Sequence, residues 1–211
     1  MTALGTLHQG LVHRRRVRVL SAMLGRYLQA GWRVLDVGTG DGLLARCLME
    51  RSGAQVQGID VLQRDNAWIP VTLFDGLHIP FADNSFDALI LVDVVHHAAD
   101  PLALLSEVVR VTRDHILIKD HLLEGWFAQS TLQFMDWVGN ARHHVHLPYN
   151  YWPREQWRRT LSDLHLQISD WTEKIPLYPW PFSWIFGRRL HFIAQVRKCP
   201  EPPQQADTSH S

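Results

Sequence analysis

Residues 34–48, VLDVGTGDGLLARCL, can adopt few local structures. A short apolar run containing Asp36 leads into three glycines at alternate positions, 38, 40 and 42, and leucines then recur at helical spacing. This pattern predicts a buried strand, a tight turn and a helix. Because glycine reaches positive φ without a Cβ, and the first N–H groups of a helix lack partners, a polar ligand can lie against the main chain here.

The glycine spacing argues against two nucleotide-binding motifs. A dinucleotide fingerprint G-x-G-x-x-G needs its third glycine at position 43, where this chain has Leu43. A phosphate-binding loop needs a terminal Gly-Lys-Ser/Thr, which is missing from this stretch. An ordinary strand-to-helix turn without a ligand remains the alternative explanation.

Acidic residues follow the next predicted strands. Residues 54–61 indicate a second strand with Asp60 at its carboxyl end, where a carboxylate can accept hydrogen bonds from a ribose diol. Residues 69–77 indicate a third short strand that ends in Asp75-Gly76. Residues 80–97 indicate a turn, a fully apolar fourth strand, and a polar exit with Asp93 and the His96-His97 pair.

From residue 32 to 119 the chain resembles the class I S-adenosylmethionine (SAM) dependent methyltransferases. The resemblance is carried by the glycine turn after Asp36, the strand-end acids and Pro-Phe-x-Asp-x-Ser-Phe-Asp at 80–87, and it is strongest to the small-molecule, quinone-biosynthesis branch. It implies SAM as cofactor, with Asp36 near its amino group and Asp75 at the adenine. The implied cofactor-binding set is Asp36, Gly38, Thr39, Gly40, Gly42, Asp60, Val61, Asp75, Gly76 and Asp93.

Strands and helices alternate from 32 to 119, which predicts a parallel, right-handed, doubly wound sheet. Asp100-Pro101 is a good helix start before the helix predicted at 101–111, and residues 115–119 predict a fifth strand. The resemblance adds an antiparallel last hairpin, for which 166–174 and 189–197 are candidates. We therefore expect an α/β, Rossmann-like sheet of seven strands in one domain over 1–199, followed by a disordered tail at 200–211.

An aromatic-rich insertion is expected at residues 120–163. Seven of the nine tryptophans lie at or after position 126. In this architecture an insertion after the fifth strand lies beside the transferred methyl group, so it is a candidate substrate pocket and lid. The alternative is that these rings bury a second layer of core.

A basic helix is predicted at residues 8–30. Arg14, Arg15, Arg16, Arg18 and Arg26 lie in it, and no acidic residue precedes Asp36. Such a helix can meet an anionic substrate or a lipid surface. The alternative is a solvated face on a helix that packs over the sheet edge.

Methyl transfer needs a general base only where the acceptor must lose a proton. Histidines and acids after the fourth and fifth strands are the candidates, and His121, Asp120 and His97 form the predicted catalytic set, with His96 also in position. A second histidine cluster, His143, His144 and His146, has no obvious carboxylate or cysteine partner at ligand spacing. We therefore expect no bound metal.

Composition limits the remaining choices. The formal net charge is zero and the two cysteines suggest neither a disulfide framework nor a metal site, so we expect a soluble, cytoplasmic protein without a transmembrane segment. The expected partner is a small, partly apolar or aromatic molecule, not nucleic acid. An RNA or protein methyltransferase and a SAM-binding partner without turnover remain alternatives. The methyl acceptor, the oligomeric state and the pathway are not readable from the sequence.

Overall fold

A computed structural model describes residues 3–140, 148–178, 180 and 189–199 of the chain. The helices are α1 (Ala3–Leu24), α2 (Leu43–Ser52), α3 (Pro101–Val111), α4 (Ala128–Asn140) and α5 (Arg154–Asp163), with short 3-10 helices η1 (Gly25–Tyr27) and η2 (Val95–His97). The strands are β1 (Arg33–Val37), β2 (Gln55–Asp60), β3 (Val71–Leu73), β4 (Phe86–Val92), β5 (Thr112–His121), β6 (Leu166–Thr172) and β7 (His191–Lys198).

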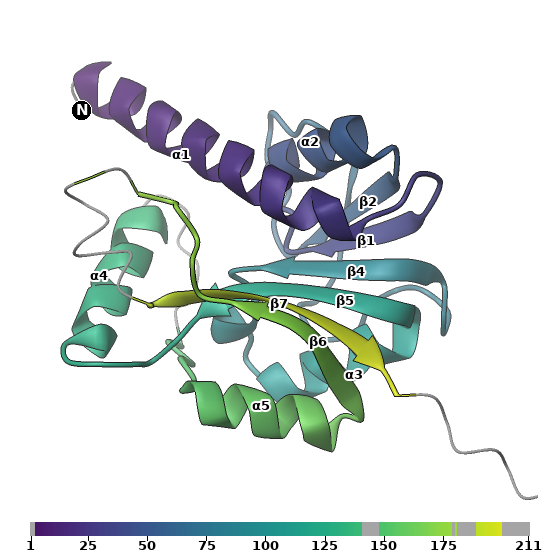
Figure 1. The fold of residues 1–211 in the computed structure, drawn as a ribbon. Coiled ribbons are helices and arrows are strands. Elements are labelled where there is room, and N and C mark those ends of the chain that lie inside the picture. Colours follow the sequence, from purple (N-terminus) through teal and green to yellow (C-terminus); the bar gives the residue numbers. More distant parts are fainter. Residues whose placement is uncertain (1–2, 141–147, 179, 181–188, 200–211) are drawn as a thin grey trace, which may run out of the picture.

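The strands form one seven-stranded sheet in the order β3-β2-β1-β4-β5-β7-β6. The pairs from β3 to β5 are parallel, and β7 runs antiparallel to both β5 and β6. Figure 1 shows α1 and α2 on one face of this sheet and α3 and α5 on the other. The predicted Rossmann-like fold with an antiparallel last hairpin is confirmed.

Side-chain alternation along the strands supplies both layers of the core. In β4, Leu89 and Leu91 join the core beneath α3 and α5, while Ala88 and Ile90 join the core beneath α1. All four are fully buried, as expected for a central strand covered on both faces. The predicted start of α3 is also confirmed, because the Asp100 carboxylate accepts hydrogen bonds from the main-chain nitrogens of Leu102 (3.1 Å) and Ala103 (3.0 Å).

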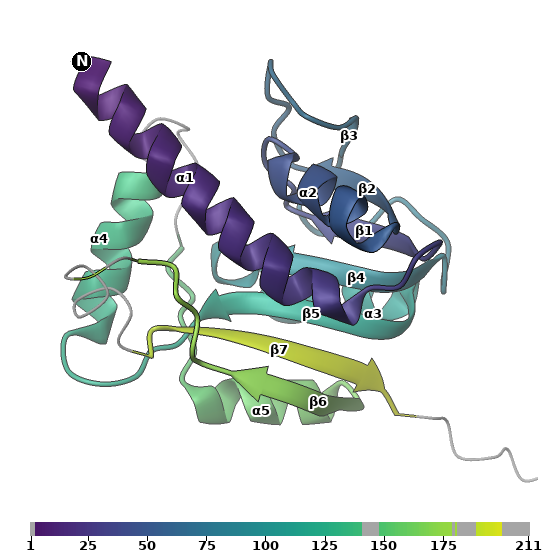
Figure 2. The same ribbon diagram turned by 45° about the horizontal axis from the view of Figure 1, so that its top comes forward.

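Helix α1 differs from the expectation in its bounds and its position. It begins at Ala3 and ends at Leu24, and it crosses the middle of the sheet instead of its edge (Figure 2). Leu20 and Leu24 pack in one core with Ile90 of β4 and Leu117 of β5. Its basic face is not simply solvated, because Arg15 donates to the Leu177 carbonyl (3.2 Å) and Arg16 pairs with Asp93.

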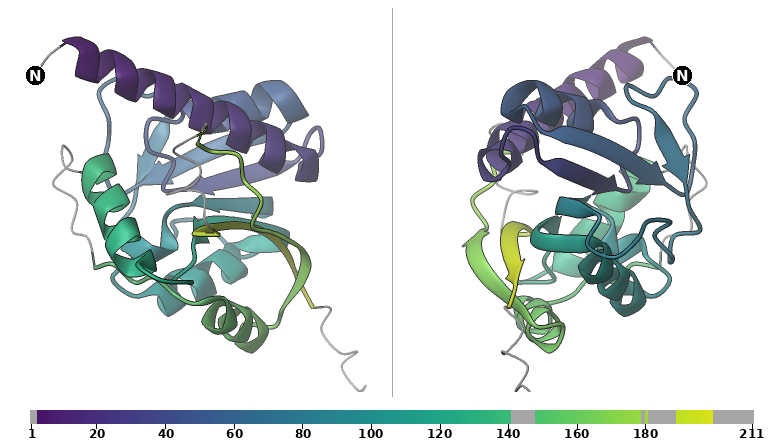
Figure 3. Two further views of the ribbon diagram at one scale, coloured as in Figure 1. Left: turned by 60° about the vertical axis from the view of Figure 1, so that its left-hand side comes forward. Right: turned by 90° about the vertical axis from the view of Figure 1, so that its right-hand side faces the viewer.

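The predicted insertion contains two helices with different positions. α5 lies against the sheet beside β6, whereas α4 lies beyond the carboxyl ends of β4 and β5, as the views in Figure 3 show. Leu132 of α4 is fully buried in a small core that includes Tyr151 and Leu190. The predicted tail at 200–211 and the histidines at 143, 144 and 146 lie outside the described residues.

Candidate cofactor and acceptor site

The glycine loop follows β1 as predicted, and its three glycines all have positive φ, +71° at Gly38, +63° at Gly40 and +74° at Gly42. Their surroundings differ. A Cβ at Gly38 would lie 2.5 Å from Val94, and one at Gly42 would lie 2.6 Å from Ile69. At Gly40 the nearest atom would be 3.9 Å away, on Arg64. Gly38 and Gly42 therefore allow close packing, whereas Gly40 presents bare main chain to open space.

Two buried carboxylates lie beneath this loop. Asp36 accepts a hydrogen bond from the Thr39 hydroxyl (2.7 Å), and Asp60 accepts from the main-chain nitrogens of Gly40 (2.8 Å) and Leu62 (3.0 Å). Burial raises the pKa of the Asp36 carboxyl to about 7; the negative charge of Asp60 adds to this rise, and the Thr39 hydrogen bond opposes it. The paired acids make this end of the sheet a favourable place for a positively charged ligand.

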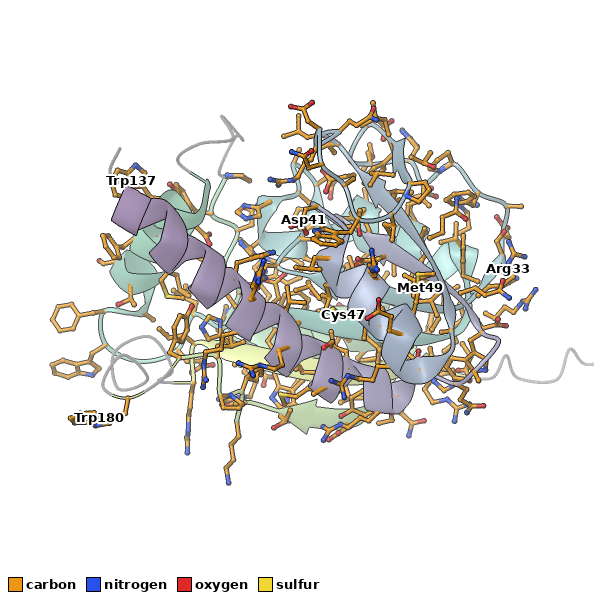
Figure 4. The ribbon with its side chains drawn as sticks, turned by 90° about the horizontal axis from the view of Figure 1, so that it is seen from above. Arg33, Asp41, Cys47, Met49, Trp137 and Trp180 are labelled. Atoms are coloured by element: carbon orange, nitrogen blue, oxygen red, sulfur yellow. The ribbon has the colours of Figure 1, made fainter. Side chains whose placement is uncertain are left out.

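The segment between β2 and β3 folds back over the loop. The Trp68 main-chain nitrogen donates to the Asp41 carbonyl (2.7 Å), which brings Ile69 onto Gly42. Figure 4 shows Asp41 at the upper end of α2. The structure thus brings Asp36, Gly38, Thr39, Gly40, Gly42 and Asp60 together.

Val61, Asp75 and Gly76 lie next to one another. A Cβ at Gly76 would be 3.1 Å from the Val61 side chain, so both residues border the same space after β2. The Asp75 carboxylate is exposed and accepts hydrogen bonds from its own turn, at the main-chain nitrogens of Leu77 (2.8 Å) and His78 (2.7 Å). The hydrogen bond to the His78 side chain, together with these two backbone bonds, lowers the pKa of Asp75 to about 2. Its predicted contact with adenine stays a prediction.

Asp93, the last member of the predicted cofactor set, has different neighbours. It has a φ of +57° at the end of β4, and its carboxylate pairs with Arg16 of α1 and Lys119 of β5. Although burial alone would raise the pKa of Asp93, these two cations hold it well below its ordinary value. Asp93 therefore joins α1 to the sheet at the boundary between the glycine loop and a second group of polar side chains.

This second group, called here the strand-end cluster, lies where β4 and β5 end and β7 begins. Its members are Asp93, His96, His97, Lys119, Asp120, His121, Asp136, Tyr151 and His191. The cluster adjoins the glycine loop because Val94, between Asp93 and His96, packs on Gly38. The cofactor loop and the cluster are therefore neighbouring parts of one edge of the sheet.

His96 and Asp120 are the best-defined pair in the strand-end cluster. The His96 Nδ1 lies 2.5 Å from an Asp120 oxygen, and both side chains are only 1% exposed. Asp120 also accepts from the main-chain nitrogens of Val95 (3.1 Å) and His121 (2.7 Å). Burial opposes the charged imidazole, but the carboxylates of Asp120 and Asp136 outweigh it and raise the pKa of His96 to about 10. Asp120 orients His96, and its own oxygens are engaged by three donors.

His121, which ends β5, and His97, which follows β4, differ in their partners. The His121 Nδ1 lies 3.0 Å from the Nδ1 of His191, its cross-strand partner on β7. Among the described residues, the buried Nδ1 of His97 has no hydrogen-bond partner. Desolvation and the neighbouring His96 lower the pKa of His97 to about 4.

The structure therefore brings the predicted catalytic residues His121, Asp120 and His97 together in one cluster. The sequence reasoning missed Lys119, Asp136, Tyr151 and His191 as members. Lys119 directly precedes Asp120, and its position in an apolar strand was a visible signal. Asp136 reaches the cluster through the packing of α4, and Tyr151 through a segment whose Asn150 nitrogen donates to the His96 carbonyl (3.1 Å), and local spacing reveals neither contact.

The residues present fit the cofactor that the sequence resemblance implies. An adenosyl sulfonium is positively charged and carries hydroxyls, and the site offers bare main chain at Gly40 above two carboxylates. A separate groove of about 740 Å³ lies between α1 and α2, beside Arg18, Cys47 and Trp68. Figure 4 labels Cys47 there, away from the strand ends. No helix in the described ranges has the length and apolar character to cross a membrane.

Comparison with known proteins agrees with this arrangement. Residues 35–116 match the family model described as a methyltransferase domain. The methyltransferase GfsG of Streptomyces halstedii is 32% identical over 113 residues, covering 46% of this chain and 41% of that protein. The ubiquinone biosynthesis O-methyltransferase of Dinoroseobacter shibae is 36% identical over 108 residues, covering 42% of each chain. The chain thus spans less than half the length of these curated relatives.

A solved structure extends the likeness to the fold. The SAM-dependent methyltransferase from Aquifex aeolicus has a TM-score of 0.58 and 21% identity, covering 82% of this chain and 85% of its own. At this identity the likeness concerns the fold. The segment that matches the family model begins within β1, contains the glycine loop, and ends within β5. Residues 35–116 therefore match the methyltransferase domain family, and the chain around them has the fold seen in a SAM-dependent methyltransferase.

Proposed function

We propose that this protein transfers a methyl group from SAM to a small, partly apolar or aromatic molecule. The observation that carries the proposal is the open main chain at Gly40 directly above the buried carboxylates of Asp36 and Asp60. A dinucleotide or a nucleoside triphosphate would bring several negative charges to this place, which the two acids disfavour. A sulfonium cofactor brings a positive charge instead.

The protein's share of the chemistry is mainly alignment. SAM supplies a methyl group that is already activated by the positive charge on sulfur. The chain's residues must hold the acceptor in line with that methyl group and exclude water from the space between them. Gly40, Asp36 and Asp60 would fix one partner, and the strand-end cluster, which adjoins the loop through Val94, would fix the other.

The candidates for contact with the acceptor are His97 and His121. His97 offers a buried nitrogen without a hydrogen-bond partner in the described part of the chain, so a hydroxyl of the acceptor could bond to it. His121 lies at the end of β5 between Asp93 and Asp136. Asp120 has three donors and is better placed to orient His96 than to remove a proton.

The relatives support a small-molecule acceptor. One of them is a ubiquinone biosynthesis O-methyltransferase, 36% identical over 108 residues. For a hydroxyl acceptor of that kind, a base at the strand-end cluster would be useful, because the oxygen must lose its proton. A carboxylate or thiolate acceptor would need none.

The test is the detection of S-adenosylhomocysteine by mass spectrometry after incubation of the full chain with SAM. Metabolite, RNA and protein fractions of one cell extract are offered separately. The account predicts product with the small-molecule fraction, and none with a Gly40→Val variant. Product with only the RNA or protein fraction would contradict the substrate class. Tight SAM binding without product in any fraction would contradict turnover.

A further inference from the structure

Three side chains from separate elements converge within the strand-end cluster: His96 from η2, His121 from the end of β5 and Asp136 from α4. Each offers one nitrogen or oxygen ligand atom, and these atoms lie within 4.8 Å of one another. All three residues are buried, with exposures of 1%, 5% and 6%. Two imidazoles and one carboxylate in a shared space form a common ligand set for divalent transition metals.

Two of the separations are close to those between ligands around one metal ion. The His96 Nε2 lies 3.3 Å from Asp136 Oδ2, and the His121 Nε2 lies 3.5 Å from Asp136 Oδ1. Ligands about 2.0–2.1 Å from a tetrahedral Zn²⁺ lie roughly 3.3–3.5 Å from each other. The two distances run to different Asp136 oxygens, and the full set of three ligand atoms lies within 4.8 Å, so the side chains would draw together to surround one ion.

The surrounding hydrogen bonds orient the two imidazole rings. Because the His96 Nδ1 faces Asp120 at 2.5 Å, the ring directs its Nε2 toward Asp136. The His121 Nδ1 faces His191 at 3.0 Å, which directs its Nε2 into the same space. Metal-binding histidines commonly have a carboxylate or another acceptor at the second ring nitrogen, since this fixes the tautomer and the ring orientation.

One atom in this arrangement is left without its usual partner. Within the described residues, the buried His96 Nε2 makes no hydrogen bond, although Asp136 Oδ2 lies 3.3 Å away. A buried imidazole nitrogen that lacks a hydrogen bond is costly unless something else binds it. A metal ion between His96 and Asp136 would give this nitrogen a partner.

We propose that His96, His121 and Asp136 form a binding site for a divalent transition metal, and that Zn²⁺ is the ion the site fits best. Two nitrogens and one oxygen suit Zn²⁺, whereas Mg²⁺ and Ca²⁺ prefer shells made of oxygen. Three protein ligands leave the fourth tetrahedral position for a small ligand. With the ion bound, both nitrogens of His121 are engaged, and His97 is the histidine left to contact the acceptor. This proposal differs from the sequence-based expectation of no bound metal, because only the folding of α4 brings Asp136 to the histidines.

The competing arrangement is a protonated His96 that pairs with Asp120 and Asp136 and needs no metal. The two arrangements differ in stoichiometric metal binding, which is measured without SAM or turnover. The full chain without an affinity tag is treated with a chelator, dialysed, and titrated with Co²⁺ by visible absorption and with Zn²⁺ by calorimetry. We expect one equivalent of each ion, with Zn²⁺ displacing Co²⁺.

Variants assign the binding to these residues. His96→Gln and Asp136→Asn should each weaken Zn²⁺ binding at least about 100-fold, and Asp120→Asn should weaken it about 10- to 100-fold through the orientation of His96. His115→Gln, on β5 but away from the cluster, and Asp163→Asn, exposed at the end of α5, are the controls and should bind like wild type. Circular dichroism checks that each variant is folded.

Absence of stoichiometric binding by the wild-type chain would overturn the proposal, even if every variant failed to fold. Binding that survives in a folded His96→Gln or Asp136→Asn variant would also overturn it. SAM binding and methyl transfer are measured separately from metal binding. Failure of the metal proposal therefore does not contradict the proposed methyl transfer, and failure of methyl transfer does not contradict the metal site.

Discussion

At the residue scale, the three glycines after β1 have different functions that their spacing does not reveal. All three have positive φ, but Gly38 and Gly42 are also required by the side chains of Val94 and Ile69 that pack on them. Only Gly40 faces open space. The sequence predicted the turn, and the structure identifies Gly40 as the position where a ligand can approach the main chain.

Asp36 gives a prediction at the same scale. Burial raises its pKa from the ordinary value of 3.8 to about 7. Because the folded-state pKa is higher, the stabilising contribution of this proton is complete below about pH 4 and is lost as the pH rises through 7. Asp36→Asn lacks this titration. From pH 4 to pH 8 its unfolding free energy should therefore rise relative to wild type, by about 4 kcal/mol at most.

Urea unfolding of both proteins across this pH range measures the difference. The control is Asp163→Asn, at an exposed position of α5, for which the difference from wild type should stay within about 0.5 kcal/mol. A constant difference between Asp36→Asn and wild type would show that Asp36 is not a strongly perturbed buried acid.

At the element scale, α4 supports part of the strand-end cluster. It carries Asp136, whose carboxylate accepts a hydrogen bond from Tyr151 and faces both His96 and His121. Its buried contact with the rest of the molecule is made through Ala128 and Leu132. The position of Asp136 therefore depends on a small apolar contact.

Two substitutions within α4 test this contact. Leu132→Ala should lower the free energy of unfolding by about 2–5 kcal/mol, because it opens a cavity at a fully buried position. Phe134→Ala, two residues away and 51% exposed, should change it by no more than about 0.5 kcal/mol. Urea denaturation gives both values. Equal effects of the two substitutions would mean that α4 is not packed as described.

The aromatic residues of the insertion fall into a buried group and an exposed group. Trp152 and Trp157 are buried in the main core beneath α5, as the core interpretation expects. Trp126, Phe127 and Trp137 are exposed, and Figure 4 shows Trp137 at the end of the molecule formed by α4. A pocket or lid role for these exposed rings stays a prediction.

At the scale of the whole molecule, the sequence predicted what depends on local pattern. The apolar strands can each be recognised from a few neighbouring residues. The same holds for the helix start at Asp100 and the acid at the end of β2. The resemblance supplied the antiparallel last hairpin. One sheet carries both core layers, with α1 packed on one face and α5 on the other, which supports the proposal that residues 1–199 form one domain.

What the sequence did not predict depends on contacts between distant residues. Arg16 and Asp93 are 77 positions apart, and Lys119 and His191 are 72 apart. Nothing near either residue of these pairs specifies the other, because the contact is created by the crossing of α1 and by the β5–β7 register. The cofactor loop could therefore be predicted in detail, while the neighbouring cluster could be predicted only in part.

The central claim is that Gly40 and the acids beneath it bind SAM, and calorimetric titration of SAM tests it most directly. Wild type is compared with Gly40→Val and with Gly31→Val, which has the same positive-φ strain at +80° in the turn before β1 and no atom within 4 Å of an added Cβ. We expect wild type and Gly31→Val to bind SAM with similar affinity, and Gly40→Val to lose at least about tenfold. Unchanged affinity in a folded Gly40→Val, or no binding by wild type, would contradict the account.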